Sequence, residues 1–287
     1  MQYRTISNIL KSEAINMGGI AVKQALPTQK VEQISPFLLL HHFGPIEVAS
    51  GRDPMDIGPH PHRGFAPVTF LYSGGLRHKD SRGNEGFLEA GDVQWMNAGR
   101  GIIHSERSSK AFLEKGGILE GIQLWVNLRQ KDKMSTPDYQ DVKAADIPVL
   151  ESLDGQVRIK VVAGSYETVS GPIRTLSPVL VLQISIKKGT ETGIMVPESY
   201  NAIQYIVKGQ LESQAGFEQP KETLLNYQQD GNAVYLKALE DSEVLLLAGE
   251  PINEPLAQWG PYVMNTQTEI LEAMRDYQQG KMGFYVD

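Results

Sequence analysis

Short runs of apolar residues, separated by turn-forming residues, recur along most of the chain. The runs span residues 67–72, 92–96, 117–128, 157–162, 178–186, 202–207, 233–239 and 244–247. Gly, Asp, Asn or Ser bounds each run, and the runs are rich in β-branched and aromatic side chains. Many short strands at this spacing predict an all-β chain that folds as sandwiches or barrels.

The strand pattern occurs twice. Phe70–Gly74 is similar to Gln204–Gly209 in hydrophobic order and in its final glycine, at an offset of 209 − 74 = 135 residues, about half the chain. A repeat of this length predicts two similar β domains, and a chain of 287 residues is long enough for both. The segment Gln130–Ser152 is polar and contains Pro137 and Pro148, so we expect it to be the linker.

One helix is predicted near the end of the chain. Thr266–Glu269 fits a capping box, in which the threonine and glutamate side chains bond backbone N–H groups at the helix start. Apolar residues follow at helical spacing, namely Ile270, Leu271, Met274 and Tyr277. We expect the helix to end near Gly280. The pattern favours a helix docked on a sheet over a helix that binds a partner.

Composition narrows the function classes. The chain has 27 basic and 34 acidic residues, a net charge of −7, which argues against nucleic acid or a membrane as the main partner. It has no cysteine, which excludes disulfides, thiolate metal sites and a catalytic thiol. The first 17 residues lack the apolar run of a secretory signal, and no apolar run is long enough to cross a membrane. We therefore expect a cytoplasmic protein.

All six histidines lie in the first half of the chain, at positions 41, 42, 60, 62, 78 and 104. If the two halves share a fold, only the first can hold an imidazole-rich metal site. His41, His42 and His78 are adjacent or isolated, and we interpret them as structural residues.

The remaining histidines form a pattern typical of metal ligands. His60 and His62 are two residues apart, as are His104 and Glu106. Residues i and i+2 of a strand share a face, so two such strands side by side can bring four donors together. A single His-x-His is weak evidence, but a second pair 104 − 62 = 42 residues later strengthens it. Three nitrogens and one oxygen suit Fe(II), Mn, Ni, Cu or Zn. Pro61 places this segment at a sheet edge, open to substrate.

The motifs around these residues resemble one known family. Pro59–Phe65 and Gly91–Glu106 closely resemble the metal-bearing motifs of the pirin family of the cupin superfamily, and Gln123–Leu128 resembles the block that follows them. Near the end of the chain, Gly249–Pro255 and Gly260–Thr266 resemble the closing motif of pirins. The resemblance covers nearly the whole chain.

The resemblance implies a bicupin fold, in which two antiparallel jelly-roll β-barrels pack together. We expect a metal-binding cupin domain over residues 1–135. A second cupin domain without metal ligands is expected over residues 136–287, including the C-terminal α-helix. This division agrees with the absence of histidine after position 104.

The resemblance also implies one metal, most often iron. The ligand positions of pirins match His60, His62, His104 and Glu106. Two departures from the general cupin pattern, no glutamate within four residues after His62 and Gly99 in place of a proline, are typical of pirins. Glu106 is also the candidate catalytic base, which would accept the proton of a flavonol 3-hydroxyl.

Three functions remain open from the sequence. Several pirins are similar in activity to quercetin 2,3-dioxygenase (quercetinase), which opens a flavonol ring with O2 and releases carbon monoxide. Other pirins act through protein partners, which suggests an iron-dependent redox-sensing regulator. A third hypothesis is another cupin reaction, such as isomerisation or metal-assisted hydrolysis. A cleft beside the metal that admits a flat three-ring ligand would favour the dioxygenase hypothesis. A closed site would favour the regulator hypothesis.

Three neighbouring side chains are expected to be structural. Arg63 follows His62 and alternates to the opposite face of an extended strand, so we expect it to form an ion pair rather than touch substrate. Trp95 and Trp125 can line a pocket for a ring-shaped ligand, but the barrel core is the favoured place for both.

Overall fold

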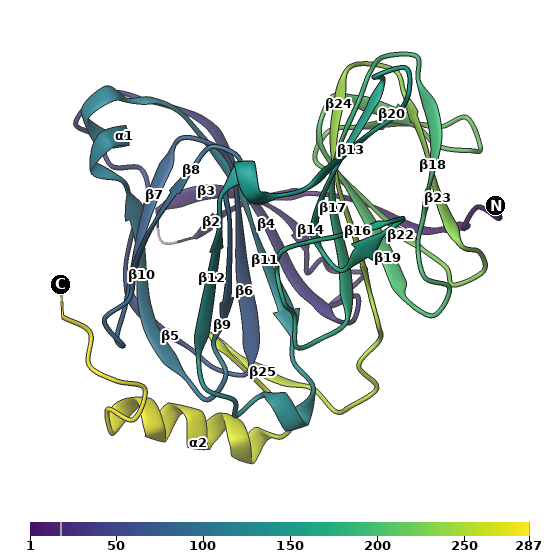
Figure 1. The fold of residues 1–287 in the computed structure, drawn as a ribbon. Helices are drawn as coiled ribbons and strands as arrows, with labels where there is room; N and C mark the ends of the chain where they lie inside the picture. The colour runs from purple at the N-terminus through teal and green to yellow at the C-terminus, as the bar shows by residue number, and fades with distance from the viewer. Residues whose placement is uncertain (18, 287) are drawn as a thin grey trace. The chain divides into compact units, whose positions relative to one another are not determined.

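The computed structural model describes residues 1–17 and 19–286, and strands dominate it (Figure 1). The chain forms two compact units, here called the first barrel and the second barrel. The first barrel consists of Ala14–Val22, Phe37–Ala144 and Ile252–Asp287, and the second of Met1–Glu13, Lys23–Pro36 and Ala145–Pro251. Each unit is therefore assembled from segments that are far apart in the sequence.

The first barrel contains a seven-stranded and a four-stranded sheet. In spatial order, the larger sheet has β12 (Asp138–Val142), β9 (Val93–Asn97), β6 (Phe65–Ser73), β11 (Gly117–Asn127), β4 (Phe37–Val48), β3 (Ile20–Leu26) and β2 (Glu13–Met17). The smaller sheet has β5 (Asp56–His62), β10 (Ile102–Ser108), β7 (Gly75–Asp80) and β8 (Glu85–Glu89). Strand β5 forms an edge of the smaller sheet, as Pro61 predicts.

The second barrel repeats this arrangement. Its seven-stranded sheet has β1 (Ile6–Lys11), β22 (Thr223–Tyr227), β19 (Asn201–Lys208), β24 (Ser242–Gly249), β17 (Val179–Ile186), β14 (Val157–Ala163) and β13 (Val149–Glu151). Its four-stranded sheet has β18 (Glu191–Met195), β23 (Ala233–Ala238), β20 (Gln210–Glu212) and β21 (Glu218–Pro220). A short pair, β15 (Ser165–Tyr166) and β16 (Val169–Ser170), completes it.

The internal repeat predicted from the sequence is confirmed by the strand order. Phe70–Gly74 lies in and directly after β6, and Gln204–Gly209 lies in and directly after β19. Each of these strands is third from one edge of its seven-stranded sheet. The interior of each barrel is apolar because alternate strand residues point inward, for example Phe43 and Leu119 in the first barrel.

The C-terminal segment belongs to the first barrel. It forms β25 (Ala257–Trp259), β26 (Tyr262–Met264) and α2 (Gln267–Gln278), and α2 contacts both strands (Figure 1). The predicted capping box is present, since Thr266 Oγ1 accepts from the Glu269 backbone and the Glu269 carboxylate accepts from the Thr266 backbone. The predicted apolar stripe is wrong at Leu271 and Tyr277, which are both exposed. Ile270 and Ala273 form the buried face.

Three short helical segments complete the elements. They are α1 (Lys110–Lys115) and the 3-10 turns at Gln130–Asp132 and Ala144–Asp146. The predicted linker, Gln130–Ser152, contains one of the points at which the chain passes from one barrel to the other, between residues 144 and 145. It is more ordered than a plain linker, because β12 pairs with β9 and β13 pairs with β14.

The observed units differ from the predicted domains, residues 1–135 and 136–287, in the placement of both ends of the chain. Strand β1 pairs with β22 and so belongs to the second barrel, while α2 belongs to the first. The sequence indicates that a strand or helix forms there, but backbone pairing and burial of an apolar face decide which unit it joins.

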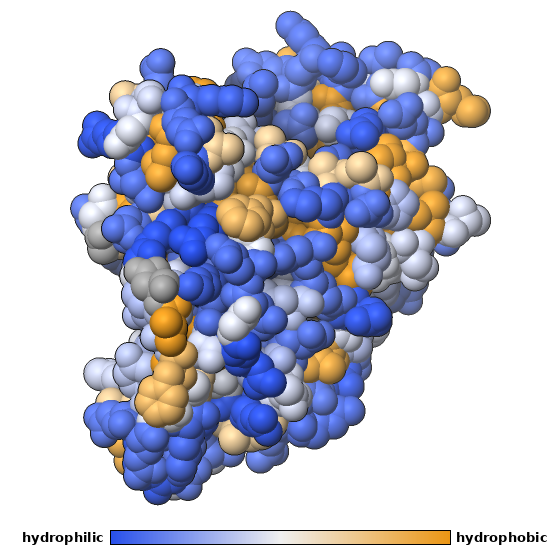
Figure 2. All heavy atoms as spheres, turned by 60° about the vertical axis from the view of Figure 1, so that its left-hand side comes forward, coloured by the Kyte–Doolittle hydropathy of each residue, from blue (hydrophilic) through white to orange (hydrophobic). Residues whose placement is uncertain are grey.

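Burial of apolar side chains leaves a largely hydrophilic face, with hydrophobic side chains in separate groups (Figure 2). Among the described residues, no helix has the length and apolar character needed to span a membrane.

Candidate metal centre

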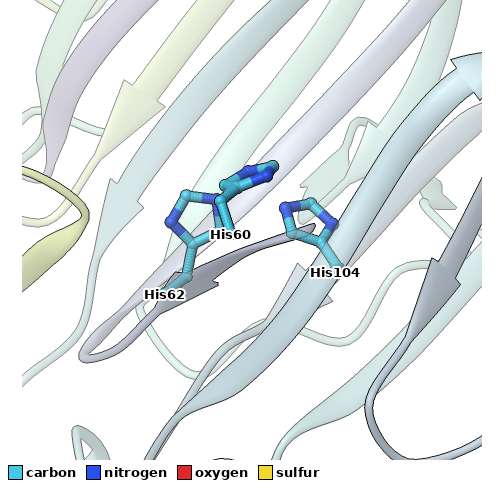
Figure 3. A group of neighbouring side chains, drawn as sticks. All are labelled: His60, His62 and His104. Carbon is cyan, nitrogen blue, oxygen red and sulfur yellow. The ribbon is translucent and has the colours of Figure 1, made fainter. Parts of the chain in front are cut away.

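Three imidazoles converge on two paired strands of the first barrel. Strands β5 and β10 run antiparallel, with His60 opposite His104 and His62 opposite Ile102. One ring nitrogen from each of the three histidines lies within 4.8 Å of the others, and Figure 3 shows the rings facing one another. The ring centroids are 4.4–4.9 Å apart. This close group of three nitrogens is a site that can hold a metal.

The buried histidines are in the form that binds a metal. Burial lowers the pKa of His62 and of His104 well below 6.5, and the neighbouring His60 lowers both further. Neutral imidazole is the ligand form. Among the described residues, neither ring nitrogen of His104 has a hydrogen-bond partner. A metal would satisfy such a nitrogen, so the donor set fits one.

A backbone contact orients the third ring. His60, which is half-buried, places Nδ1 2.9 Å from the carbonyl oxygen of Gly58. With Nδ1 donating to this carbonyl, the lone pair of Nε2 is left for a metal, an arrangement common around ligand histidines.

Glu106 lies outside this group of nitrogens in the structure. Its Oε1 accepts from the hydroxyl of Thr69 at 3.4 Å, and its Oε2 accepts from the amide of Gln123 at 3.2 Å. The β5–β10 register shifts between His104 and Glu106, and Glu106 pairs with Ile57. Two residues of β5 therefore face one residue of β10 at this point, as in a β-bulge.

The barrel interior beside Glu106 is nearly filled. A cavity of about 10 Å³ is lined by apolar side chains together with His41, Thr69, Glu106 and Gln123. This volume holds about one water molecule. A flavonol cannot enter the barrel on this side of the carboxylate, so access to the three histidines must come from elsewhere.

A buried lysine fixes the turn that follows the ligand strand. Lys133 Nζ donates to the carbonyl oxygens of Gly64 and Val263 and to the side-chain oxygen of Asn127, at 2.6–3.0 Å. Burial lowers the pKa of Lys133 to about 7. The three acceptors match the three N–H bonds of the ammonium form. Gly64 comes two residues after His62, so this lysine anchors the ligand strand to β26.

The expected ion pair of Arg63 is confirmed. The guanidinium of this buried residue bonds the Asp276 carboxylate of α2 and donates through Nε to the carbonyl of Arg100. The backbone of Arg63 also bonds Pro261 and Val263. The strand that presents the histidines is thus held by the C-terminal segment.

An aromatic pair borders the site. The ring of Trp125 lies 5.6 Å from that of His62 and 4.2 Å from that of Phe65, and its indole is only partly buried. Trp125 therefore borders the site, whereas its favoured place from the sequence was the barrel core. Trp95 is 3% exposed and belongs to the core, as expected.

The other three histidines are buried but are not members of the ligand group. His42 bonds the carboxylate of Glu120 at 3.2 Å. His78 stacks on Tyr139 and contacts the amide of Gln94. For His42 and His78, these contacts support the interpretation as structural residues.

Sequence reasoning missed the residues that surround the ligands. Thr69 and Gln123 each lie between two apolar residues of their strand, which is a signal for a polar group aimed into a barrel. Lys133 gives no such signal, because it lies in a polar segment that looks exposed.

Two family models match the chain. The Pirin model matches residues 19–126 and the Pirin C-terminal cupin domain matches residues 181–283. A pirin-like protein of Solanum lycopersicum is 37% identical over 287 residues, which cover 98% of this chain and 94% of the relative. The chain belongs to the pirin family. Pirin of Mus musculus is 34% identical and covers 96% of the chain and 93% of its own length.

Two solved structures share the fold. A crystal structure of quercetin 2,3-dioxygenase from Acinetobacter baumannii has a TM-score of 0.92 and 35% identity, and the match covers 98% of this chain and 99% of that one. A bacterial pirin from Escherichia coli in complex with nickel(II) has a TM-score of 0.65 at 20% identity, covering 85% of this chain and 99% of that one. The bicupin fold expected from the sequence is confirmed.

Proposed function

We propose that this pirin is a metal-dependent dioxygenase that opens the ring of a flavonol of the quercetin type. The convergence of three imidazoles, two of them on the edge strand β5, is the observation that supports this most strongly. The similarity along nearly the whole chain to a quercetin 2,3-dioxygenase adds to it. In the overall reaction both atoms of O2 enter the opened product, and one ring carbon leaves as carbon monoxide.

The proposed metal ligands are His60, His62 and His104, with Glu106 as the fourth. Fe(II) is the preferred ion, and Mn, Ni, Cu or Zn also suit this donor set. When bound, the metal supplies positive charge that stabilises a deprotonated flavonol and, if redox-active, electrons for O2. The Glu106 carboxylate lies outside the group formed by the three imidazoles. To bind the metal, it has to give up its hydrogen bond with Gln123 or Thr69.

Glu106 is also the proposed base. Its two oxygens accept hydrogen bonds from separate donors, so one oxygen can take the proton of the flavonol 3-hydroxyl while the other stays held. Thr69 and Gln123 orient the carboxylate for this transfer. The narrow cavity behind Glu106 keeps bulk water out on that side. The substrate must then approach from the side of the half-buried His60.

The experiment is aerobic turnover of quercetin by protein loaded with Fe(II). Loss of flavonol absorbance together with carbon monoxide release is expected in the wild type. Both should vanish in His62→Ala, with loss of bound metal. His42→Gln is the matched control, since it replaces a buried histidine outside the ligand group and can still donate to Glu120. One metal per chain without turnover of quercetin would contradict the proposal for this substrate.

A second variant separates the base from the ligands. Glu106→Gln should lower turnover by about 100-fold or more, because a general base typically contributes that much. Metal content is measured in the same samples. Full turnover with metal still bound would remove the base role of Glu106.

The narrow interior favours a second candidate, a redox-sensing regulator that acts through a protein partner. A cavity of about 10 Å³ beside Glu106 is what a closed site would have. In that case the protein binds one iron per chain, does not turn over quercetin, and changes affinity for its partner between Fe(II) and Fe(III). Turnover that depends on His62 would exclude this as the main role.

A further inference from the structure

The second barrel contains a cavity that the metal centre does not use. Its volume is about 700 Å³, within the range of small-molecule sites. It lies where β1, β19 and β22 face the segment from β20 to β21, and all its lining residues belong to the second barrel. The lining includes Ile9, Gln204, Leu211, Phe217, Leu225 and Tyr227.

Two buried polar side chains line this cavity with unused hydrogen-bonding capacity. Gln204 is 1% exposed, and its Oε1 accepts from the Tyr227 hydroxyl at 2.9 Å. Among the described residues, no partner bonds the amide nitrogen of Gln204. The tyrosine oxygen, having donated its proton, keeps lone pairs. A side-chain donor that lines a cavity without a protein partner can donate to a ligand, so the site favours a ligand with an acceptor such as a carbonyl.

The position of Gln204 matches a residue of the metal centre. With the repeat offset of 135 residues, 204 − 135 = 69, and Thr69 lies on β6, the equivalent strand of the first barrel. Thr69 bonds Glu106 at the inner side of the metal centre. The cavity of the second barrel therefore lies at the place that corresponds to the site of the first, without histidines.

The charged residues at this cavity already have partners. Arg4 donates to four backbone carbonyl oxygens. Glu212 accepts from Lys237 at 2.6 Å. Two large apolar side chains, Ile9 and Phe217, are nevertheless 47% and 66% exposed where they border it. An apolar border, charged groups that already have partners, and one amide donor at the cavity wall suit a ligand that is apolar and uncharged.

We propose that the second barrel has its own ligand site, which binds an uncharged aromatic carbonyl compound. Its rings contact Phe217 and Leu225, and its carbonyl oxygen accepts from Gln204. The site does not depend on the metal centre or on the proposed dioxygenase activity.

The test uses the full-length protein and coumarin, a neutral two-ring compound with one carbonyl, in isothermal titration calorimetry. Gln204→Leu should weaken binding by about three- to tenfold, the worth of one hydrogen bond. Ala215→Trp should abolish it, because Ala215 is an exposed residue that lines the cavity and a tryptophan there fills the mouth without altering the core.

Two comparisons make the result decisive. His62→Ala should bind coumarin as the wild type does, so that failure of the metal site leaves this measurement unaffected. Coumarin-3-carboxylate should bind more weakly, because the one cation among the described lining residues, Arg4, already donates to backbone carbonyl oxygens. Lack of coumarin binding, or an affinity unchanged in both Gln204→Leu and Ala215→Trp, would overturn the proposal. Equal affinity for the carboxylate would overturn the preference for an uncharged ligand.

Discussion

The guanidinium of Arg63 donates two hydrogen bonds, each 3.0 Å long, to the same oxygen of Asp276. Arg63 directly follows the ligand His62, and Asp276 lies on α2, 276 − 63 = 213 residues later. The pair therefore joins the strand of the candidate metal centre to the C-terminal helix of the same barrel.

Asp276→Asn should lower the free energy of unfolding by about 2–3 kcal/mol, since loss of one partner leaves the buried Arg63 uncompensated. The estimate is below that for a fully buried pair because Asp276 is 14% exposed. Urea denaturation measures the change. Lys281→Met is the control, because it removes an exposed pair with the same aspartate, typically worth below about 1 kcal/mol. Equal losses in the two variants would rule out the special role of Arg63.

Gly64→Ala should destabilise the first barrel and weaken metal retention. Gly64 has φ +85°, and a Cβ there would overlap the carbonyl oxygen of Val263. Gly83 has φ +86° with open space around it, so Gly83→Ala isolates the cost of the backbone conformation, about 1–2 kcal/mol. Gly64→Ala should cost about 1–3 kcal/mol more, from overpacking. Thermal denaturation and metal analysis compare them, and similar losses would contradict the overlap.

Lys133→Met should cost about 2–4 kcal/mol, because it leaves buried oxygen acceptors of Gly64, Asn127 and Val263 without a donor. Lys131→Met makes the same substitution at an exposed position nearby and should be close to neutral. Chemical denaturation measures both. If Lys133→Met unfolds at the same denaturant concentration as Lys131→Met, the lysine does not anchor the turn.

His41 should make the fold sensitive to acid. Burial lowers its pKa from 6.5 to about 4. Between these values the unfolded chain binds a proton that the folded chain does not, so stability falls as pH drops from 6.5 towards 4. This group contributes up to about 3 kcal/mol over that range. Denaturation at several pH values should show a shallower pH dependence for His41→Gln than for the wild type. Parallel pH profiles would assign the acid sensitivity to other groups.

Local signals predicted much of this fold. Turn residues between apolar runs indicate the strands, and the capping box indicates where α2 begins, because both depend on neighbouring residues. The face that α2 buries was predicted less well from its row of apolar residues. Leu271 is apolar but exposed, since the face that a helix buries is set by the surface it meets rather than by apolarity alone.

The sequence by itself determined the three histidines of the candidate site. The spacing of His60 and His62 puts both on one face of a strand, and His104 occurs in a second motif of the same kind. It did not determine the surroundings of Glu106, because the bulge in β5 and the donors on β6 and β11 come from pairing between distant strands.

Only the tertiary structure decided which segments join which barrel. Strand β1 and helix α2 each pack in the unit built mainly from the other half of the chain. A hydrophobic pattern says that a face must be buried but not against which partner. That choice is made by backbone pairing and close packing between residues hundreds of positions apart. The same long-range packing buries Lys133 and shapes the cavity around Gln204.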